Sequence, residues 1–348
     1  MNDAHQRLLS VVLVSYGSRN DLERLLPTLY SEALEDLEII VVDNQPGDGT
    51  AAWLAAHYAD VRVLALSGNL GYSGGNNAGI AEAQGRYVLI LNPDTELHEG
   101  TLGHLLHAAH TNPDALITAK LLQPDGSINA CGLQFHHTGV VSCRHLGEQA
   151  DRHTALHPVP LLSGAAFITS KEILTKLGGF SEPYFMYFED VDLSLRAKLL
   201  GYRLLCAGNA VVTHYYKLSM NTRKFYQLER NRLLTLLRLY QIQTFWRLAP
   251  GLLFTEGLMW MFALLKGPAY VRARLRGYIW LWQQRTPWQA ERHKIQQMRI
   301  LNDERLLAEA STELPFEQLI QNAKLVRILV GLTRGFYATK PLVPRRSR

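Results

Sequence analysis

Four short apolar runs, rich in β-branched residues, alternate with segments of helical period in the first part of the chain. They occupy residues 8–15, 37–42, 61–66 and 86–91. Strands that alternate with helices are typical of a parallel sheet, because the linking helices then cover both faces of the sheet. The alternation therefore predicts an α/β fold with a parallel sheet at its centre.

Polar residues follow each of these runs, at the edge of the predicted sheet where α/β folds bind their ligands. They are Tyr16 after the first run, Asp43 and Asn44 after the second, Asn69 beyond the third, and Asn92 and Asp94 after the fourth. Because parallel strands end at the same edge of a sheet, we expect these side chains to converge on one crevice.

The pattern becomes more mixed beyond about residue 115. The expected elements are a hairpin through Gly132 and Gly139, a strand at 163–169, a helix at 171–177, and strands at 202–206 and 210–213. Long helical runs rich in Leu, Arg, Trp and Tyr follow. This change predicts a first domain over residues 1–225 and a helical C-terminal region over residues 226–348.

The basic character of the chain is confined to one region. The 348 residues have a net charge of +5, but residues 217–300 hold 15 Lys and Arg against three Asp and Glu. That segment carries about +12, which leaves about −7 for the rest of the chain. A negatively charged partner is therefore expected for the C-terminal region.

Cysteine content and the N-terminus bear on the compartment. Cys131, Cys143 and Cys206 are too few and too scattered for a disulfide framework or a zinc cluster, which favours a reducing compartment. The first residues lead directly into a strand and lack the basic region and apolar core of a secretion signal. We expect a cytoplasmic protein.

Three carboxylates, Glu189, Asp190 and Asp192, follow an aromatic and apolar run at 184–188 and begin a predicted helix. Carboxylates against apolar surface favour a raised pKa, which a general base working near neutral pH needs. The alternative is structural: Asp192 and Arg196 would pair at i,i+4, and the other two would favour the helix N-terminus. The residues alone leave both interpretations open.

Asp43 and the glycine-rich segment after the third run could bind a nucleotide. Asp43 could accept the imide N–H of a uracil or thymine ring, or it could be a turn or capping residue, although Asp48 is the better capping candidate. Gly71, Gly74 and two further glycines would let backbone approach a ligand, and the helix after them would offer free N–H groups to a phosphate. Asn76 could bind the pyrophosphate or the sugar, or simply begin that helix. The spacing is not G-x-G-x-x-G, which disfavours a dinucleotide cofactor.

A metal site is predicted after the fourth run. Asp94 could bind a divalent cation that bridges two phosphates and takes up the charge that grows on a nucleotide-diphosphate leaving group. His214, after the last predicted strand, could supply a neutral imidazole to this cation. The alternatives are a strand-ending turn shaped by Pro93 and a structural histidine.

Taken in their order along the chain, these segments resemble family 2 glycosyltransferases, and most of all their bacterial rhamnosyltransferase-like members. The resemblance covers roughly residues 8–235. It is carried by residues 14–16, 42–44, 69–79, 91–95, 178–180 and 188–193 and by His214. It implies a glycosyltransferase A-type fold, to which the helical C-terminal extension is added, and an inverting hexosyltransferase.

The resemblance also implies roles for single residues. Asp94 and His214 would bind Mg²⁺ or Mn²⁺, and Asp190 would be the catalytic base that deprotonates the acceptor hydroxyl, with Glu189 as the alternative base. The family's usual Asp-x-Asp is Asn92-x-Asp94 in this chain, which predicts a lower metal affinity. The expected donor-binding residues are Tyr16, Asp43, Gly71, Gly74, Asn76 and Asn92.

The basic C-terminal region suggests a membrane surface. Residues 245–265 are apolar and long enough for a membrane span, but Arg247, Pro250 and Glu256 interrupt them. The segment that follows mixes basic and aromatic side chains, namely Arg272, Arg274, Arg276, Tyr278, Trp280 and Trp282. This mixture suits helices that lie in the headgroup region of an anionic leaflet. The alternatives are a packed helical bundle, a true span, and a binder of single-stranded nucleic acid, although no recognised nucleic-acid fold accompanies the segment.

These observations predict a peripheral enzyme on the inner face of the plasma membrane. The resemblance implies that it would transfer a sugar from dTDP-rhamnose or a UDP-sugar to a lipid-linked glycan in cell-surface polysaccharide synthesis. No nucleic-acid partner is expected. A sugar-nucleotide pyrophosphorylase would need a Gly-rich basic loop after the first strand, and residues 15–20 are a poor version of one. A peripheral membrane protein that binds nucleotide sugars without turnover is the non-enzymatic alternative, and the carboxylates Asp94 and Asp190 argue against it.

Overall fold

The computed structural model describes residues 7–216, 219–319, 331 and 333. The chain divides into two compact units. The first comprises Met1–Leu133, Cys143–Ala197 and Tyr202–Lys217, and the second comprises Gln134–Ser142, Lys198–Gly201 and Leu218–Arg348. The boundary predicted near residue 225 stays a prediction, because compactness does not show which part of a chain folds independently.

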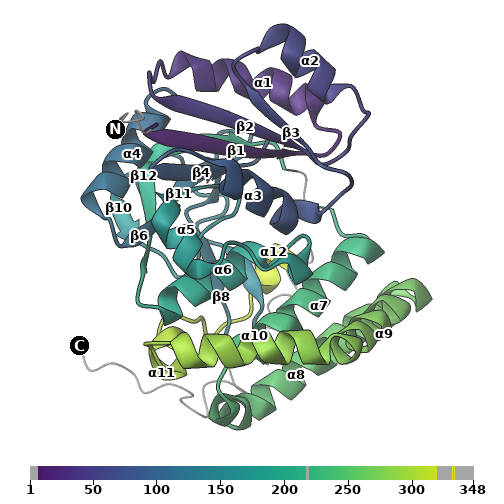
Figure 1. Ribbon diagram of the computed structural model, residues 1–348. Helices are drawn as coiled ribbons and strands as arrows, with labels where there is room; N and C mark the ends of the chain where they lie inside the picture. The colour runs from purple at the N-terminus through teal and green to yellow at the C-terminus, as the bar shows by residue number, and fades with distance from the viewer. Residues whose placement is uncertain (1–6, 217–218, 320–330, 332, 334–348) are drawn as a thin grey trace. The chain divides into compact units, whose positions relative to one another are not determined.

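One large sheet forms the centre of the first unit (Figure 1). Its strands are β1 Leu9–Ser15, β2 Leu37–Asp43, β3 Arg62–Ala65, β4 Tyr87–Leu91, β5 Thr95–Leu97, β6 Ala115–Leu122, β7 Ile128–Ala130, β10 Leu156–Pro158, β11 Ala166–Ser170 and β12 Arg203–His214. The strand order is β10-β12-β6-β11-β4-β1-β2-β3, with β5 beside β12 and β7 beside β6. Two short strands, β8 Leu133–Phe135 and β9 Val141–Cys143, pair separately where a hairpin was expected.

The sheet is parallel where the sequence predicts it and mixed elsewhere. β1 pairs in parallel with β2 and β4, and β2 with β3. β11 runs antiparallel between β4 and β6. The strands predicted at 202–206 and 210–213 are one strand, β12, whose register shifts between Ala207 and Val211. A bulge of this kind interrupts the apolar pattern without ending the strand.

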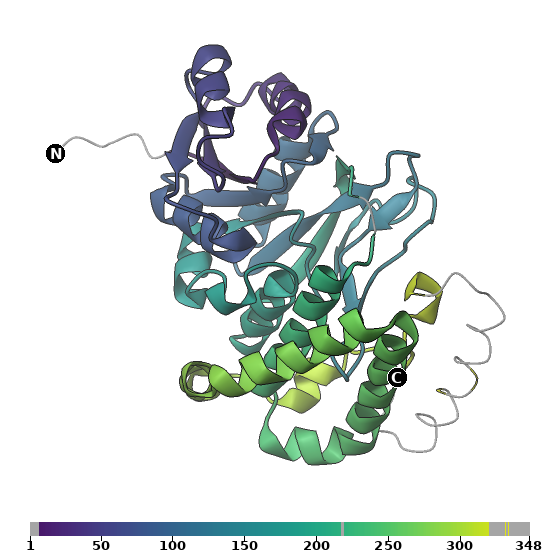
Figure 2. The same cartoon turned by 90° about the vertical axis from the view of Figure 1, so that its right-hand side faces the viewer.

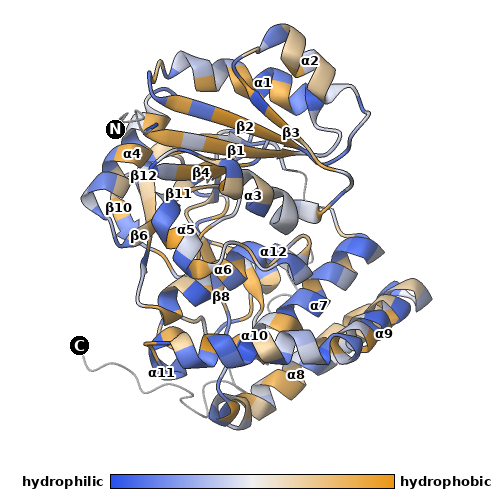
Figure 3. Ribbon diagram, in the orientation of Figure 1, coloured by the Kyte–Doolittle hydropathy of each residue, from blue (hydrophilic) through white to orange (hydrophobic). Residues whose placement is uncertain are grey.

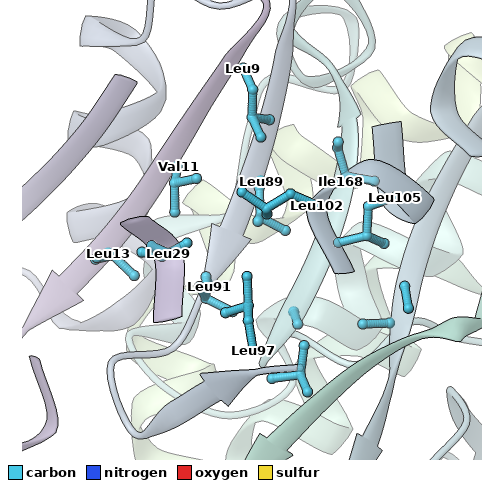
Figure 4. Packing of buried hydrophobic residues seen from close by; sticks show 14 of the residues in the cluster. Leu9, Val11, Leu13, Leu29, Leu89, Leu91, Leu97, Leu102, Leu105 and Ile168 are labelled. Atoms are coloured by element: carbon cyan, nitrogen blue, oxygen red, sulfur yellow. The ribbon is translucent and has the colours of Figure 1, made fainter. Parts of the chain in front are cut away.

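Helices cover both faces of this sheet. They are α1 Arg19–Ser31, α2 Thr50–His57, α3 Gly71–Glu82, α4 Thr101–Thr111, α5 Lys171–Leu177 and α6 Glu189–Leu199. Successive side chains of a strand point to opposite faces. Val11 of β1 lies in the main core cluster with Leu29 of α1 and Leu105 of α4 (Figure 4). The next residue, Val12, faces α3, where a Cβ on Gly79 would lie 2.3 Å from Val12 Cγ1. Glycine at this position lets α3 lie directly against the sheet.

The second unit is helical. Its helices are α7 Thr222–Leu239, α8 Ile242–Lys266, α9 Pro268–Gln283, α10 Arg285–Met298, α11 Asp303–Leu307 and α12 Phe316–Leu319. Helices α7 and α8 both pack against α9 (Figure 2). Four charged residues meet among them: Arg232 and Arg274 each form ion pairs with both Glu229 and Glu256. The hydroxyl of Tyr278 also donates to Glu256, at 2.6 Å. This network pairs two buried guanidinium groups with two carboxylates.

The charge network corrects one prediction about the membrane. Helix α8 is long and apolar enough to cross a membrane, with a mean hydropathy of 1.6 in its most apolar window (Figure 3). Glu256 belongs to this helix and is paired with Arg274, which is only 2% exposed. Arg274 was expected at lipid headgroups and instead lies inside the helical unit. Its neighbours Arg272 and Arg276 are exposed, one turn apart on α9.

Candidate active site

The ends of β1, β2 and β4 bring polar residues to one edge of the sheet. Ser15 lies opposite Asp43 in the register of β1 and β2, and Leu13 lies opposite Leu91 in that of β1 and β4. Tyr16, Asp43 and Asn92 therefore stand side by side, as the sequence predicts. Tyr16 is 55% exposed, whereas Asp43 is only 2% exposed.

Pairing of β5 with β12 brings His214 to Asp94. In this antiparallel pair His214 lies opposite Thr95, and the N–H of Tyr215 donates to the carbonyl of Asp94 at 2.8 Å. His214 Nε2 lies 3.4 Å from Asp94 Oδ1, close enough for an ion pair but not aligned as a hydrogen bond. Neither ring nitrogen of His214, nor the buried Oδ1 of Asn92, has a hydrogen-bond partner within the described part of the chain. These unsatisfied nitrogen and oxygen atoms suit a divalent cation with mixed ligands.

A strained loop leads into the helix that carries Glu189 and Asp190. Three non-glycine residues just before α6 have positive φ angles: Phe185 at 62°, Tyr187 at 67° and Phe188 at 72°. Each such conformation costs about 1–3 kcal/mol, so it persists only where surrounding contacts enforce it. The loop sets where α6 begins and thus the direction of both carboxylates.

Asp190 is held at the same edge of the sheet by backbone. Its Oδ2 accepts from the N–H of Gly164 at 2.9 Å, and its Oδ1 accepts from the N–H of Val191 at 2.8 Å. The neighbouring carbonyl of Ala165 accepts from the N–H of Asn92 at 2.8 Å. Asp190 is therefore fixed beside the segment that carries Asn92 and Asp94.

The two neighbouring carboxyl groups differ in the contacts that set their pKa. Burial raises the pKa of both, and for Glu189 the nearby Asp190 and Asp192 raise it well above the usual range. The two N–H groups that contact Asp190 oppose this rise. Glu189 is 7% exposed, and its Oε2 has no hydrogen-bond partner among the described residues. Asp190 is partly exposed. This arrangement favours a proton on Glu189 and a charge on Asp190.

Asp192 has the structural role that was the alternative for this cluster. Its Oδ2 accepts from Arg196 Nε at 2.7 Å, and its Oδ1 accepts from the hydroxyl of Tyr184 at 3.1 Å. Arg196 also donates to the backbone carbonyls of Leu177 and Gly179. The predicted i,i+4 pair is confirmed, and Asp192 orients α6 rather than a ligand.

Asp43 and Asp48 both form turns. Asp43 Oδ1 accepts from the N–H of Gln45 at 3.0 Å, which is the turn geometry given as one alternative. Asp48 Oδ1 accepts from the N–H of Thr50, the first residue of α2, at 2.8 Å. The expectation that Asp48 caps this helix is wrong, because the N-cap residue of α2 is Gly49 and Asp48 forms a turn just before it. Recognition of a base by Asp43 stays a prediction.

The glycine-rich segment is itself the start of a helix. The carbonyl of Phe185 accepts from the N–H groups of Tyr72 and Ser73 at 2.6 and 3.3 Å, and Asn69 Oδ1 accepts from that of Gly71 at 2.8 Å. The expectation of free N–H groups is therefore wrong for these three residues. A Cβ on Gly71, whose φ is 71°, would lie 2.3 Å from the Phe185 carbonyl oxygen.

Gly74 and Asn76 continue the same pattern of internal contacts. A Cβ on Gly74 would lie 2.7 Å from Leu70 Cβ. Asn76 Nδ2 donates to the carbonyl of Tyr72 at 2.9 Å, and its buried Oδ1 has no partner among the described residues. Contact of Gly71, Gly74 or Asn76 with a sugar nucleotide stays a prediction.

Tyr72 is a site residue that the sequence did not single out. Its hydroxyl donates to the carbonyl of Gly164 at 2.6 Å, and the N–H of that glycine holds Asp190. Burial raises the pKa of Tyr72 well above its usual range, and the charges of Glu189, Asp190 and Asp94 raise it further. The carboxyl groups of Glu189, Asp190 and Asp94 therefore all lie near Tyr72. Its position within the glycine-rich segment was the one available signal.

Comparisons with known sequences identify the family and several relatives of this chain. Residues 10–178 match glycosyl transferase family 2. The chain is 31% identical over 233 residues to an N-acetylglucosaminyl-diphospho-decaprenol L-rhamnosyltransferase of Mycobacterium tuberculosis, with 60% of this chain and 76% of that protein covered. It is 24% identical over 226 residues to the rhamnosyltransferase WbbL of Escherichia coli, with 60% and 83% covered.

Solved structures show the same kind of fold. GalNAc-T7, crystallised with UDP, GalNAc and Mn²⁺, aligns with a TM-score of 0.57 at 15% identity and covers 71% of this chain and 51% of that one. S. aureus TarS residues 1–349, in complex with UDP-GlcNAc, aligns with a TM-score of 0.53 at 18% identity, with 76% and 79% covered.

Proposed function

This chain belongs to glycosyl transferase family 2, and we propose that it transfers rhamnose from a dTDP-linked donor to a lipid-linked glycan during cell-surface polysaccharide synthesis. It is a glycosyltransferase, and the expected A-type fold is confirmed by its solved neighbours. Two relatives named rhamnosyltransferases support the donor sugar, and the decaprenyl diphosphate in the name of one supports the acceptor class.

The observation that carries this proposal is the fixing of Asp190 beside the Asn92–Asp94 segment. An acceptor hydroxyl must lose its proton as it attacks the anomeric carbon, and a fixed, partly exposed carboxylate can accept that proton. Attack from the face opposite the nucleotide inverts the anomeric centre. Glu189 favours its neutral form and is therefore the weaker candidate for the base.

Donor choice can be tested by incubating the purified protein with a panel of nucleotide sugars and Mg²⁺ or Mn²⁺ and measuring the nucleotide released. We expect dTDP-rhamnose to be turned over faster than UDP-GlcNAc. A higher rate with a UDP-sugar would contradict rhamnose while leaving the enzyme class intact. No release from any donor, with a lipid-diphosphate glycan acceptor present, would contradict the proposed activity.

A divalent cation is proposed at Asp94 and His214. Asp94 and Asp190 both lie near Tyr72, so their negative charges would repel a diphosphate without a cation. Bound there, a cation would neutralise the charge that develops on the leaving diphosphate. The imidazole favours Mn²⁺ over Mg²⁺, which prefers an all-oxygen shell.

Asp94→Ala should weaken binding of a nucleoside diphosphate chiefly when metal is present, because the carboxylate acts through the cation. Calorimetry with Mn²⁺ and with a chelator, on wild type and variant, measures this difference. Asn92→Asp is the companion change, and by adding a second carboxylate it should tighten metal binding. If the wild type binds the nucleotide equally tightly with metal and with chelator, the proposed role of the cation in nucleotide binding is wrong.

The helical unit is proposed to bind the anionic inner surface of the plasma membrane. Large apolar side chains are exposed at helical spacing on α8 and α9, with Trp246 78% and Leu265 80% exposed. The others are Ile242, Leu253, Met261, Leu264, Leu275, Ile279 and Trp282. Exposed Arg272 and Arg276 lie on the same helix as three of them. Apolar side chains beside cations suit the boundary between headgroups and acyl chains.

Arg272→Gln/Arg276→Gln should weaken binding to anionic vesicles by about 25-fold at low salt, since each cation near such a surface contributes roughly 1 kcal/mol. Cosedimentation measures this, and added salt should mimic the change in part. Activity on a water-soluble acceptor should stay near the wild-type level. If both proteins bind neutral and anionic vesicles equally well, the charge-dependent attachment is wrong.

A further inference from the structure

Two histidines and a glutamate gather in the segment between β9 and β10, in the first unit. His145 Nδ1 lies 2.9 Å from Glu148 Oε1, and His153 Nε2 lies 3.0 Å from Glu148 Oε2. The two imidazole rings are stacked with centroids 3.6 Å apart. One ligand atom from each residue lies within 4.8 Å of the others. This spacing lets all three reach one ion, with bonds of about 2.0–2.2 Å, after small side-chain rotations.

The backbone holds these three residues in place. The carbonyl of His145 accepts from the N–H of Glu148, and Glu148 in turn accepts from the N–H of Ile128, next to the sheet. His153 is fixed against β12, where a Cβ on Gly208 would lie 1.8 Å from its carbonyl oxygen. Buried Lys120 donates to the carbonyls of Ala150 and Arg152 between them.

Both histidines have left-handed backbone, with φ of 60° at His145 and 53° at His153. This conformation is uncommon for a residue with a side chain, and here it turns both rings toward one carboxylate. Glu148 contacts a ring nitrogen of each histidine, so its carboxylate and the two imidazoles offer their ligand atoms at one point.

A third histidine lies beside the cluster. The ring of His157 is 6.1 Å from that of His153, and its Nδ1 contacts the carbonyl of Ala155 at 2.9 Å. That contact makes Nδ1 the protonated nitrogen and leaves a lone pair on Nε2, which is buried without a hydrogen-bond partner in the described chain. Burial lowers the pKa of His157, so its neutral form is favoured. Its unsatisfied nitrogen is a candidate fourth ligand.

We propose that His145, Glu148 and His153 form a binding site for a transition-metal ion of the Zn²⁺ class, separate from the proposed cation site at Asp94 and His214. Two imidazoles and one carboxylate are a donor set that zinc favours, whereas Mg²⁺ and Ca²⁺ prefer oxygen. Partial exposure of all three residues gives the ion access from solvent. The bound ion would cross-link the β9–β10 segment.

The positive charge of the nearby Arg152 disfavours binding of a cation but does not prevent it. Arg152 Nη1 lies 3.7 Å from Glu148 Oε2, and the Arg152 side chain is 64% exposed. Such a side chain can turn toward water at little cost, because an exposed ion pair contributes only about 0–1 kcal/mol. Arg152→Gln should therefore leave zinc binding intact or tighten it.

The test is calorimetric titration of the metal-free full chain with ZnCl₂. We expect one site that survives Asp94→Ala and that loses roughly 10–100-fold or more in affinity in His145→Ala/His153→Ala. Zinc should also raise the thermal midpoint of the wild type and not that of the double variant, since an ion that binds only the folded state stabilises it. Co²⁺ in place of zinc should give the visible absorption of a tetrahedral nitrogen and oxygen site.

Matched controls keep the result interpretable. His57→Ala removes an exposed histidine whose Nδ1 contacts its own helix, and this variant should bind zinc like the wild type. Glu148→Gln keeps the shape of the side chain and should still weaken the binding of zinc. This variant tests the site even if the double variant fails to fold. The site is refuted if the wild type binds zinc only at millimolar concentration, if the cluster variants bind as tightly as the wild type, or if Asp94→Ala alone abolishes binding.

Discussion

Asp190→Asn should lower turnover by about 100-fold or more while donor binding stays near the wild-type level, because the change removes a proton acceptor and preserves shape. Steady-state rates at saturating acceptor measure the loss, and calorimetry measures donor affinity. The activity of the wild type should fall as the pH falls, since Asp190 must be unprotonated to act and burial raises its pKa.

Glu189→Gln is the matched control, one residue away on the same helix. Because the environment of Glu189 already favours its neutral form, replacement by a neutral amide of the same shape should cost far less activity. Wild-type-like turnover by Asp190→Asn would exclude Asp190 as the base. A large loss in Glu189→Gln alone, with Asp190→Asn active, would transfer that role to Glu189.

Arg274→Met should destabilise the helical unit by about 3–5 kcal/mol, because it leaves a buried negative charge without full compensation. Arg274 is 2% exposed and is paired with both Glu229 and Glu256. Urea unfolding followed by tryptophan fluorescence would measure the change, since Trp260 and Trp280 lie on α8 and α9.

Arg276→Met is the matched control, two residues along the same helix and exposed. It should change the free energy of unfolding by no more than about 0.5 kcal/mol. Equal effects of the two substitutions would show that the buried network does not stabilise the unit.

The same network gives the helical unit a pH dependence. Burial alone would raise the pKa of Glu229, but Arg232 and Arg274 outweigh it and lower that pKa below its usual range. The corresponding stability is therefore present above the ordinary pKa of a glutamate and is lost as the pH falls through the lowered value.

Features that depend on neighbouring residues could be predicted from the sequence. The runs that became β1 to β4 alternate with helices, and their polar ends have to meet at one edge of a parallel sheet. The helix over 171–177 was predicted, and the pair of Asp192 with Arg196 was one of two interpretations left open. Both depend on contacts within a few residues. Asp94 and Asp190 were singled out because they follow a strand and an aromatic run, and their roles stay predictions.

What the tertiary structure decided depends on contacts between distant segments. An apolar run does not specify its direction, so the antiparallel placement of β11 was not foreseeable, and neither was the pairing of β5 with β12 that sets His214 beside Asp94. Arg274 and Arg276 carry the same charge in the sequence, and only the structure shows that Arg274 is buried among carboxylates. Arg276 is exposed.

Backbone conformation accounts for the other features of the structure that the sequence did not predict. Phe185 has a left-handed conformation that its residue type disfavours, and its carbonyl occupies the N–H groups that were expected to be free for a phosphate. His145 and His153 share that conformation, which brings their rings together across eight residues of sequence. The sequence by itself determined the first four strands and the polar edge of the sheet, because local periodicity encodes them. Only the tertiary structure decided which of these groups meet, because strand direction, burial of charge and strained φ angles follow from packing between distant segments.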